Sequence, residues 1–414
     1  MMDGEKMASP PPNGTETVLE TATVTKIVRD DGVKMINTFE VVKKLGKGSF
    51  GKVKLCRNTH DGELYAIKVM DKNILRRKRQ GMTNMLENVK KEIAIMKKLN
   101  HPHCVRMYEV IDDPDSNKLY LRLEYVSGGQ CMPSENGTTP LPLEKAQSYF
   151  ADLIIGLEYL HHNHVLHRDI KPENLLVTAE GRLKLADFGV SQHLGDDGDD
   201  LISKSAGTPA FMAPECCVPG SFHGKLADIW AAGVSLYFFV HGSCPFVNSN
   251  VMRLYEMIQE DPVTFKEGLP PPLLDLLKQI LNKNPSERLK IAAIKEHEWF
   301  KPISESPNLG TPVAVSEAEI ANAFSMSERV VLLVKIRERM LGRLRNVRNT
   351  IAERKGNGVD GKVEAEAPPV SIKEGEQQAV EIPEGMVEQV DSDDEGSKGE
   401  PTTSSRSESR CRIM

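Results

Sequence analysis

The sequence predicts an α+β protein with two lobes: a small lobe on an antiparallel β-sheet with one helix, and a larger, mainly helical lobe. Short runs rich in β-branched residues come first, in FEVVKKL, GKVKLC, YAIKVM and KLYLRLEY, and such runs are typical of strands. Helical periodicity with turn signals follows, as far as about Pro302. Strands that come first and helices that follow indicate an α+β fold.

The composition is that of a globular chain. Its 414 residues, 39% of them hydrophobic, can bury a substantial core. A net charge of −6 argues against a general nucleic-acid binder. The seven cysteines include no C-x-x-C pair, so neither a zinc site nor a disulfide framework is indicated. The longest apolar run, at 230–240, is too short to span a bilayer, and we predict a cytoplasmic location, with the nucleus as a second one.

Segments of distinct composition flank the two predicted lobes. Residues 1–36 mix Pro, Gly, Thr and charge, which predicts a disordered leader. Residues 303–327 predict a linker with a short helix, for which Ser316 and Glu319 form a capping box. Residues 356–414 predict a disordered acidic tail, because its first 45 residues hold thirteen Asp/Glu against three Lys/Arg.

Three glycines, Gly46, Gly48 and Gly51, fit the pattern G-x-G-x-x-G, with Val53 two residues further on. Glycine lets backbone amides approach phosphate oxygens closely, yet the same string also opens dinucleotide-binding folds and occurs at plain hairpin tips. A dinucleotide-binding unit needs a helix directly after the glycines. Here GKVKLC continues as a strand and returns as ELYAIKVM, so the dinucleotide interpretation is rejected.

Lys68 lies in the middle of a predicted strand, among apolar neighbours. An unpaired ammonium would be costly there, so Lys68 needs a carboxylate or phosphate partner. The predicted helix at 85–99 offers Glu92 on the same face as Val89 and Met96. The face that buries apolar groups therefore also points a carboxylate inward, which makes Glu92 the candidate partner.

Two further strings, HRDIKPEN and DFG, match a signature whose members have separate roles. Asp169 can orient a substrate hydroxyl and accept its proton, and Lys171 can steady a transferred phosphoryl group. Asn174 and Asp187 can hold Mg²⁺ between phosphates. The pattern predicts phosphoryl transfer with ATP and Mg²⁺, which depends on positioning and charge neutralisation more than on covalent chemistry.

With these motifs in order, the chain resembles the eukaryotic protein kinase family from Phe39 to Phe300. The resemblance implies a bilobal protein kinase fold over residues 37–302. The small lobe would cover about 39–124 and the large lobe about 127–300. Every motif residue needed for transfer is present, which argues against the rival interpretation of a pseudokinase scaffold.

The resemblance also implies roles for individual residues. The glycine loop would cover the phosphates of ATP, and Ala66 would lie over the adenine. Lys68 would contact the α- and β-phosphates, with Glu92 as its ion-pair partner. The implied ATP-binding residues are Leu45, Gly46, Lys47, Gly48, Ser49, Phe50, Gly51, Val53, Ala66, Lys68, Glu92, Glu124 and Val126.

Other residues have structural roles by the same resemblance. LEYVSGG, at 123–129, would be the hinge, with Leu123 as the gatekeeper. Asp228 would brace the catalytic loop. Arg288 would pair with Glu215 of the APE string that closes the activation segment.

Residues near the catalytic strings indicate which amino acids the enzyme phosphorylates and how its activity is regulated. Lys171 and Thr208 resemble the Ser/Thr branch of the family rather than the tyrosine kinases. Arg168 can bind a phosphate on the activation segment through charge-assisted hydrogen bonds. Ser205 and Ser203 are the nearest acceptors, and we predict that phosphorylation of Ser205 activates the enzyme; the alternative is an unmodified loop serine.

Longer stretches resemble the calcium/calmodulin-dependent protein kinase kinases and related upstream activators of AMP-activated protein kinase relatives. They are EIAIMKKLNHP, EVIDDPDSNKLYL, GTPAFMAPE and DIWAAGVSLYFFVHGSCPF, and Phe211 stands where most kinases have Tyr or Trp. The resemblance implies a kinase that acts on the activation segment of other kinases. The alternative is a basophilic kinase of the calmodulin-dependent type, because RRKRQGMT replaces a longer Arg/Pro-rich insert and Glu173 can meet a substrate arginine.

Residues 328–355 predict a basic amphipathic regulatory helix, with nine Lys/Arg, three Glu and one apolar stripe. Such a helix can bind calmodulin, lie on an anionic membrane or pack against its own kinase lobe. VVLLVK, at 330–335, resembles the core of the kinase-kinase calmodulin-binding region, which favours calmodulin. The final CRIM fits C-a-a-X loosely, because Arg412 is not aliphatic, and makes Cys411 a candidate for prenylation and weak membrane association.

Overall fold

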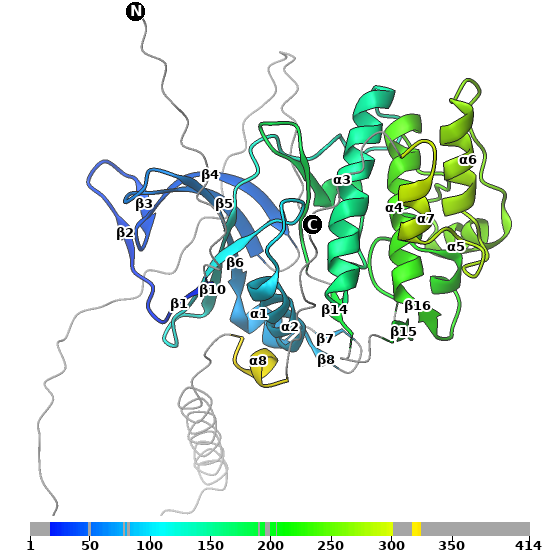
Figure 1. Cartoon of the computed structure of the whole chain (residues 1–414). Coiled ribbons are helices and arrows are strands. Elements are labelled where there is room, and N and C mark those ends of the chain that lie inside the picture. The colour runs from blue at the N-terminus through cyan, green and yellow to red at the C-terminus, as the bar shows by residue number, and fades with distance from the viewer. Residues whose placement is uncertain are drawn as a thin grey trace, which may run out of the picture. The chain divides into compact units, whose positions relative to one another are not determined.

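The computed structural model describes residues 17–48, 51–77, 79–80, 83–188, 191–194, 199–203, 205–300 and 317–323. All of them belong to the unit that contains residues 1–328, and the second unit, 329–410, lies outside them. A sheet with helices beside it is followed by a helical lobe (Figure 1), so the predicted bilobal α+β fold is confirmed. The predictions for 328–355, for the acidic tail and for Cys411 lie outside the described residues.

Five antiparallel strands form the centre of the small-lobe sheet. They are β4 (Phe39–Gly48), β5 (Gly51–Asn58), β6 (Leu64–Asp71), β9 (Met107–Asp112) and β10 (Lys118–Glu124). β5 turns into β6 near Gly62, whose φ of 75° suits glycine. β6 is paired on both sides, with β5 and with β10, so the strand that carries Lys68 is a central one.

Three short strands precede these five and extend the sheet at both edges. β1 (Leu19–Thr21) pairs with β9, β3 (Lys34–Ile36) pairs with β4, and β2 (Lys26–Val28) pairs with β3. The prediction of a disordered leader over 1–36 is therefore wrong for residues 17–36. The side chains of β1 and β2 are mostly exposed, so the amino-acid composition does not indicate that this segment is ordered. Backbone hydrogen bonds to the open edges of the sheet stabilise these strands instead.

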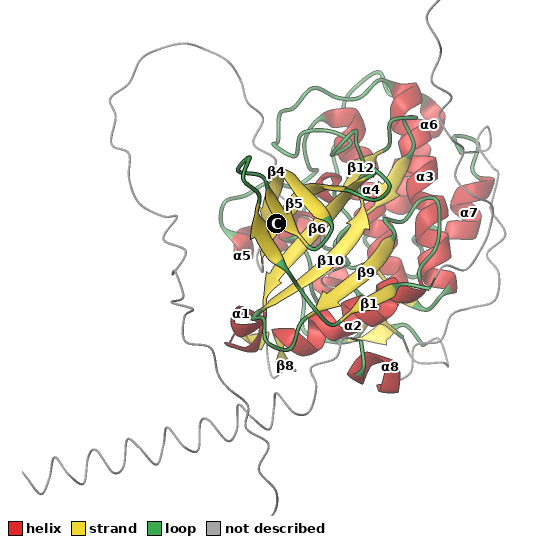
Figure 2. Ribbon diagram, turned by 90° about the vertical axis from the view of Figure 1, so that its left-hand side faces the viewer, coloured by secondary structure: helices red, strands yellow, loops and turns green. Residues whose placement is uncertain are grey.

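The outermost strands, β1 and β2, are joined by residues 22–25 although they stand at opposite ends of the strand order. So short a connection requires the sheet to curl (Figure 2). Val24, within the connection, packs against an apolar cluster on the sheet face opposite to Lys68. The buried members of this cluster are Ile36, Phe39, Cys56, Ile67, Ile111 and Tyr120. The N-terminal segment thus covers one face of the small-lobe sheet.

Two helices and a short hairpin lie between β6 and β9. They are α1 (Lys72–Arg77), the hairpin of β7 (Arg79–Gln80) and β8 (Thr83–Asn84), and α2 (Met85–Lys98). α2 buries Val89, Ile93 and Met96 on the face that the sequence predicts. Glu92 is buried with them, at 3% exposure.

The large lobe is built around α4 (Gly224–His241), which is buried over most of its length. α3 (Leu143–His162) and α6 (Pro271–Ile280) pack against it. α5 (Val251–Glu260) and α7 (Ile291–Glu296) lie beside them (Figure 1). Within the described part of the chain, no helix is both long enough and apolar enough to cross a membrane.

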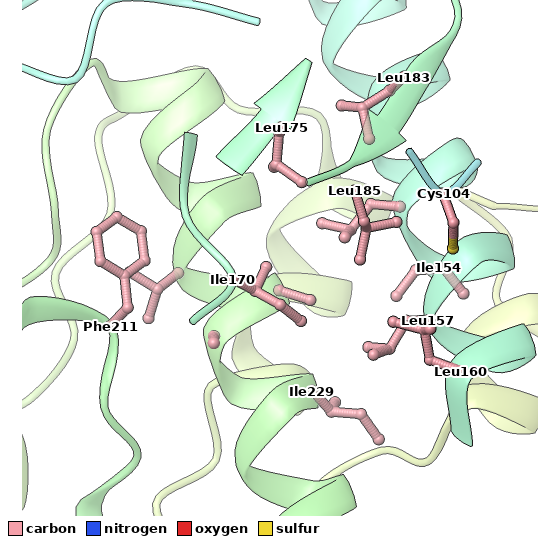
Figure 3. Packing of buried hydrophobic residues seen from close by; sticks show 14 of the residues in the cluster. Cys104, Ile154, Leu157, Leu160, Ile170, Leu175, Leu183, Leu185, Phe211 and Ile229 are labelled. Atoms are coloured by element: carbon pink, nitrogen blue, oxygen red, sulfur yellow. The ribbon is translucent and has the colours of Figure 1, made fainter. Parts of the chain in front are cut away.

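The chain between α3 and α4 carries the HRDIKPEN, DFG and APE strings. Its elements are β11 (Val165–Leu166), η1 (Pro172–Asn174), β12 (Leu175–Val177), β13 (Leu183–Leu185), β14 (Gln192–His193), β15 (Leu201–Ile202), η2 (Pro209–Phe211), η3 (Pro214–Cys216) and β16 (Phe222–His223). Figure 3 shows Ile170, Leu183 and Leu185 of this stretch pointing into the core near Ile154 and Leu157 of α3. All five are 0% exposed, so the backbone of the catalytic loop is anchored in the large-lobe core.

One further helix, α8 (Glu317–Ala321), follows the large lobe in sequence but contacts α2 of the small lobe (Figure 1). It falls within 303–327, where the sequence predicts a short helix. Ser316, the predicted capping residue, lies outside the described residues.

Replacing Ile36 by alanine tests the packing of the N-terminal strands. Ile36 is 4% exposed within the sheet cluster, so Ile36→Ala should lower the free energy of unfolding by about 2–4 kcal/mol. Ile27 on β2 is 51% exposed, and Ile27→Ala should change it by less than about 0.5 kcal/mol. Urea unfolding followed by circular dichroism measures both, and equally small effects would contradict the burial of β3.

Candidate active site

The predicted phosphate loop is the connection between β4 and β5. Gly46 is aligned with Val53, and Gly48 with Gly51, so the two strands stay paired up to the turn. A Cβ added to Gly51 would lie 1.7 Å from the carbonyl oxygen of Val69 on β6. Glycine therefore lets β5 approach its neighbour closely at this point. The remaining loop positions, Ser49, Phe50 and the side chain of Lys47, lie outside the described residues.

β6 carries two predicted ATP-binding residues, Ala66 and Lys68, and its register places them beside residues of β5 and β10. Ala66 is aligned with Leu55 of β5 and with Leu123, the predicted gatekeeper, on β10. Lys68, two residues further on and hence on the same face, is aligned with Val53. The register of three strands therefore gathers residues from three separate parts of the sequence.

The predicted hinge begins where β10 ends. The carboxylate of Glu124 lies 2.8 Å from Lys184 Nζ, and Val126 is buried. Lys184 therefore holds the side chain of Glu124 at the end of β10. Leu45, which precedes the glycines on β4, is half-buried.

Lys68 lies between two carboxylates from different elements. Its Nζ is 2.9 Å from Glu92 Oε1 on α2 and 3.2 Å from Asp187 Oδ1 in the DFG string. Burial opposes the charge of Lys68, but Asp187 and Glu92 raise its pKa above the ordinary value, so the ammonium persists. Burial also raises the pKa of Glu92, and the Lys68 ammonium opposes that rise. The structure thus contains the Lys68–Glu92 pair and adds Asp187, which the sequence did not indicate as a partner of Lys68.

Asp187 has a left-handed backbone conformation, with φ of 60°. This conformation is uncommon for a residue other than glycine and indicates that the surroundings impose it. The next residue, Phe188, is fully buried, and its ring centroid lies 5.3 Å from that of His167. Burial of Phe188 therefore fixes the backbone from which Asp187 reaches Lys68.

Asp169 is the centre of a second polar cluster. Lys171 Nζ lies 2.9 Å from Asp169 Oδ2 and donates to Thr208 Oγ1 at 2.7 Å. Thr208 donates to Asp169 Oδ1 from its backbone N–H at 3.0 Å and from its hydroxyl at 2.8 Å. Asn174 Nδ2 donates to the backbone carbonyl of Asp169 at 2.8 Å and to its Oδ2 at 3.0 Å. The fold therefore brings the two predicted catalytic residues and one predicted metal ligand together.

The activation segment approaches the catalytic loop at Gly207, whose φ is 105°. A Cβ at Gly207 would lie 2.2 Å from the carbonyl oxygen of Arg168. Arg168 donates from Nη1 to Gln192 Oε1 at 2.9 Å. Ser203 and Ser205 are exposed, and Ser205 lines a surface cavity together with Arg168. Both predicted phosphorylation sites are therefore accessible.

Asp228, on α4, holds the catalytic loop through its backbone. Its carboxylate accepts the backbone N–H groups of His167 at 2.9 Å and Arg168 at 2.8 Å, and lies 3.0 Å from His161 Nε2. Burial raises the pKa of this carboxyl, but the hydrogen bonds from His161 and from the loop backbone outweigh burial and lower the pKa below its ordinary value. Two successive N–H groups directly before Asp169 are thereby fixed.

Glu215 and Arg288 form the bidentate pair that the resemblance implies. Arg288 Nη1 and Nη2 lie 2.6 Å and 2.9 Å from the two carboxylate oxygens of Glu215. The Arg288 side chain is fully buried and lies over the ring of Trp230, 5.1 Å from its centroid. Bidentate arginine–carboxylate pairs are geometrically specific, so this contact fixes the end of the activation segment to the large lobe.

The donors at Asp187 and Asn174 fit a magnesium ion. Mg²⁺ takes oxygen ligands, usually one or two from the protein, with substrate phosphates and water supplying the rest. The two residues are brought together because the backbone N–H of Ala186 donates to the carbonyl of Asn174 at 2.8 Å. The Asn174 amide nitrogen is engaged by Asp169, an orientation that leaves its amide oxygen for a cation.

The family model for the protein kinase domain matches residues 39–300, so the chain belongs to the protein kinase family, whose domain uses ATP with Mg²⁺. A probable serine/threonine-protein kinase of Dictyostelium discoideum is 42% identical over 322 residues, which cover 75% of this chain and 45% of that protein. Serine/threonine-protein kinase GRIK1 of Arabidopsis thaliana is 43% identical over 284 residues, 68% of this chain and 72% of that protein. The calcium/calmodulin-dependent protein kinase kinase of Caenorhabditis elegans is 39% identical over 338 residues, 75% of this chain and 62% of that protein. The predicted family is confirmed, and the chain spans less than half the length of the Dictyostelium relative.

Replacing Asp228 by asparagine should loosen the catalytic loop and lower stability. An amide cannot replace both carboxylate oxygens as acceptors, and the buried donors left unsatisfied should cost about 1–3 kcal/mol each. The lowered pKa of Asp228 adds a pH dependence. A carboxyl with a depressed folded-state pKa stabilises the fold above its ordinary pKa and loses this contribution as the pH falls through the folded-state value.

The difference in stability between wild type and Asp228→Asn should therefore be largest near neutral pH and shrink below about pH 4. Thermal unfolding between pH 3 and pH 7 measures this difference. A gap of constant size over that range would show that the charge of Asp228 contributes nothing.

Proposed function

We propose that the chain transfers the γ-phosphate of ATP to serine or threonine hydroxyls of proteins. The observation that carries the proposal is the convergence of Lys68, Glu92 and Asp187, from three elements far apart in sequence, beside the cluster around Asp169. A lysine between two carboxylates and an aspartate with a nearby lysine are the charges that phosphoryl transfer requires. Membership of the protein kinase family supports the same chemistry.

In this proposal each residue of the site has a defined task. Lys68 binds the α- and β-phosphates, and Glu92 holds the Lys68 ammonium in place. Asp187 and Asn174 hold Mg²⁺, which neutralises phosphate charge when bound. Asp169 orients the substrate hydroxyl and accepts its proton as the hydroxyl oxygen bonds to the γ-phosphorus and the bond to the bridging oxygen of ADP breaks. Lys171, paired with Asp169, steadies the phosphoryl group during transfer.

We further propose that the substrates are activation segments of other kinases. The nematode relative carries the name of a kinase kinase, and its alignment covers 75% of this chain. The resemblance to that group includes Phe211 in GTPAFMAPE. Phe211 is buried at the end of η2, three residues after Thr208, which contacts Asp169. This resemblance therefore lies in the part of the site next to the acceptor position.

Regulation is proposed at three positions. A phosphate on Ser205 would give Arg168 a charge-assisted partner in place of Gln192, and unchanged activity of a phosphatase-treated Ser205→Ala protein would contradict this. Residues 328–355 would bind calmodulin, and calorimetry of that peptide with and without calcium tests the idea. Prenylation of Cys411 would add a reversible membrane anchor to a cytoplasmic protein, and an unmodified C-terminal mass in cells would exclude it.

A panel of catalytically inactive kinases tests the main proposal. The full chain with Mg²⁺ and ATP, with and without calcium-calmodulin, should phosphorylate the activation segment of at least one panel member. Asp169→Ala should lower kcat by about 10²–10⁴-fold and leave ATP affinity nearly unchanged, because the other residues proposed to hold the nucleotide remain. Transfer that persists at the wild-type rate in Asp169→Ala would contradict the assignment of Asp169.

A basophilic kinase with diverse substrates is the second candidate function, and Glu173 favours it. Glu173 lies on η1, between Lys171 and Asn174. Its Oε2 is buried and has no hydrogen-bond partner among the described residues. A substrate guanidinium would supply the partner that a buried carboxylate oxygen requires.

A peptide array combined with Glu173→Gln separates the two candidates. If Glu173 binds a substrate arginine, the variant should lower kcat/KM for Arg-containing peptides by about tenfold to a hundredfold, with little effect on Arg-free peptides. Unchanged kinetics on both sets would reject this role of Glu173. Strong phosphorylation of short Arg-containing peptides, with none of a folded kinase, would reject the kinase-kinase proposal.

A further inference from the structure

Segments from both flanks of the kinase domain meet at the end of α2. β1 precedes residue 39 and α8 follows residue 300, so both lie outside the stretch that the family model matches. Glu20 of β1 lies 2.6 Å from Lys97 Nζ, and Glu319 of α8 lies 2.7 Å from Lys98 Nζ. Two successive lysines in the last turn of α2 are thus held by carboxylates from opposite flanks of the domain.

We propose that β1 and α8 form a clamp that sets the position of α2. Glu20, Glu319 and Ile320 are then positioning residues for the Lys68–Glu92 ion pair. The inference rests on the proposed function, since α2 contributes to phosphoryl transfer through that ion pair.

The geometry of α2 explains how contacts at its end act on Glu92. Successive residues of an α-helix are rotated by about 100°, so Lys97 and Lys98 project about 140° and about 240° around the axis from Glu92. The two lysines therefore lie on either side of the helix face opposite to Glu92. At 1.5 Å per residue, Lys98 is only about 9 Å from Glu92 along the axis. Contacts on both outer sides resist a roll of the helix that would carry Glu92 away from Lys68.

Apolar contacts anchor the clamp. Ile320 packs against the large hydrophobic cluster to which α2 contributes Ile93 and Met96, and Ala323 is a buried member of the same cluster, at 1% exposure. Val18, directly before β1, packs against this cluster too.

The two ion pairs orient β1 and α8 on α2 but add little to the stability of the contact. Exposed ion pairs stabilise weakly, and the side chains of Glu20 and Glu319 are 56% and 47% exposed. Burial of Ala323 and packing of the partly buried Ile320 therefore supply the attachment. The charges on Lys97 and Lys98 orient the two segments on the helix.

Charge reversal with rescue in the full-length chain tests the clamp. Glu319→Lys places a like charge beside Lys98 and should lower kcat/KM for ATP by about three- to tenfold, mainly through a higher KM for ATP, with KM for the protein substrate unchanged. Lys98→Glu should act in the same way. The double variant Lys98→Glu/Glu319→Lys should restore kcat/KM to within about twofold of wild type, whereas Ile320→Asp should be impaired at least as much as the single reversals.

Lys295→Glu is the matched control. Lys295 pairs with Glu158 at 2.8 Å between α7 and α3 of the large lobe, and the two side chains are 18% and 21% exposed, less than those of Lys98 and Glu319. Reversal of Lys295 should leave kcat/KM for ATP within about twofold of wild type. Titration of Mg²⁺-ATP binding gives a readout that needs no phosphate transfer. Weaker binding in Glu319→Lys with rescue in the double variant supports the clamp even if the wild type phosphorylates no protein, so failure of the proposed function remains distinguishable.

Three results would overturn the clamp. The first is wild-type ATP kinetics and binding in both Glu319→Lys and Ile320→Asp. The second is a loss in Lys295→Glu as large as in Glu319→Lys, which would indicate general destabilisation. The third is a double variant that stays as impaired as the single reversals.

Discussion

The ammonium of Lys68 couples three elements of the fold. A buried charge is stable only while it is compensated, and here Glu92 of α2 and Asp187 of the DFG string both compensate Lys68 of β6. Withdrawal of Lys68 would leave two facing carboxylates without a counter-charge, and withdrawal of either carboxylate would remove one of the two contacts that hold the ammonium in place. The sheet, α2 and the segment after β13 must therefore be positioned together, and every other contact near the site can be judged by which of these three elements it holds.

Two of the three elements are held firmly by buried groups. β6 is a central strand, and Phe188 anchors the DFG string in the core. The catalytic loop is fixed by Asp228 and the end of the activation segment by Arg288, each with several partners. α2 differs, because its inner face is buried whereas the ion pairs at its last turn are half-exposed. The catalytic loop and the DFG string are therefore held in place by the large-lobe core. The position of α2 depends in part on weak surface contacts.

Asp169, Asn174 and Asp187 could be predicted from the sequence because they belong to motifs, HRDIKPEN and DFG, whose residues follow one another in a fixed order. Glu92 could be found differently, because helical periodicity places it on the apolar face and Lys68 needs a partner. The bonds from Thr208 to Asp169 and from Arg168 to Gln192 could not be predicted, since they join segments that meet only in the fold. β1 and β2 were missed because apolar patterning reports side-chain burial, and these strands are stabilised by backbone pairing.

Open edges and a small core explain why sequences outside 39–300 become ordered here. A lobe of about ninety residues buries too little surface to fix all of its elements by itself, and the outer strands of its sheet present unpaired backbone groups. β1 covers the edge at β9, and β3 covers the edge at β4. α8 contacts α2 and adds apolar packing of Ile320 and Ala323 to the core. The flanking segments are therefore part of the folded small lobe, and the position of Glu92 depends on residues that the catalytic strings do not contain.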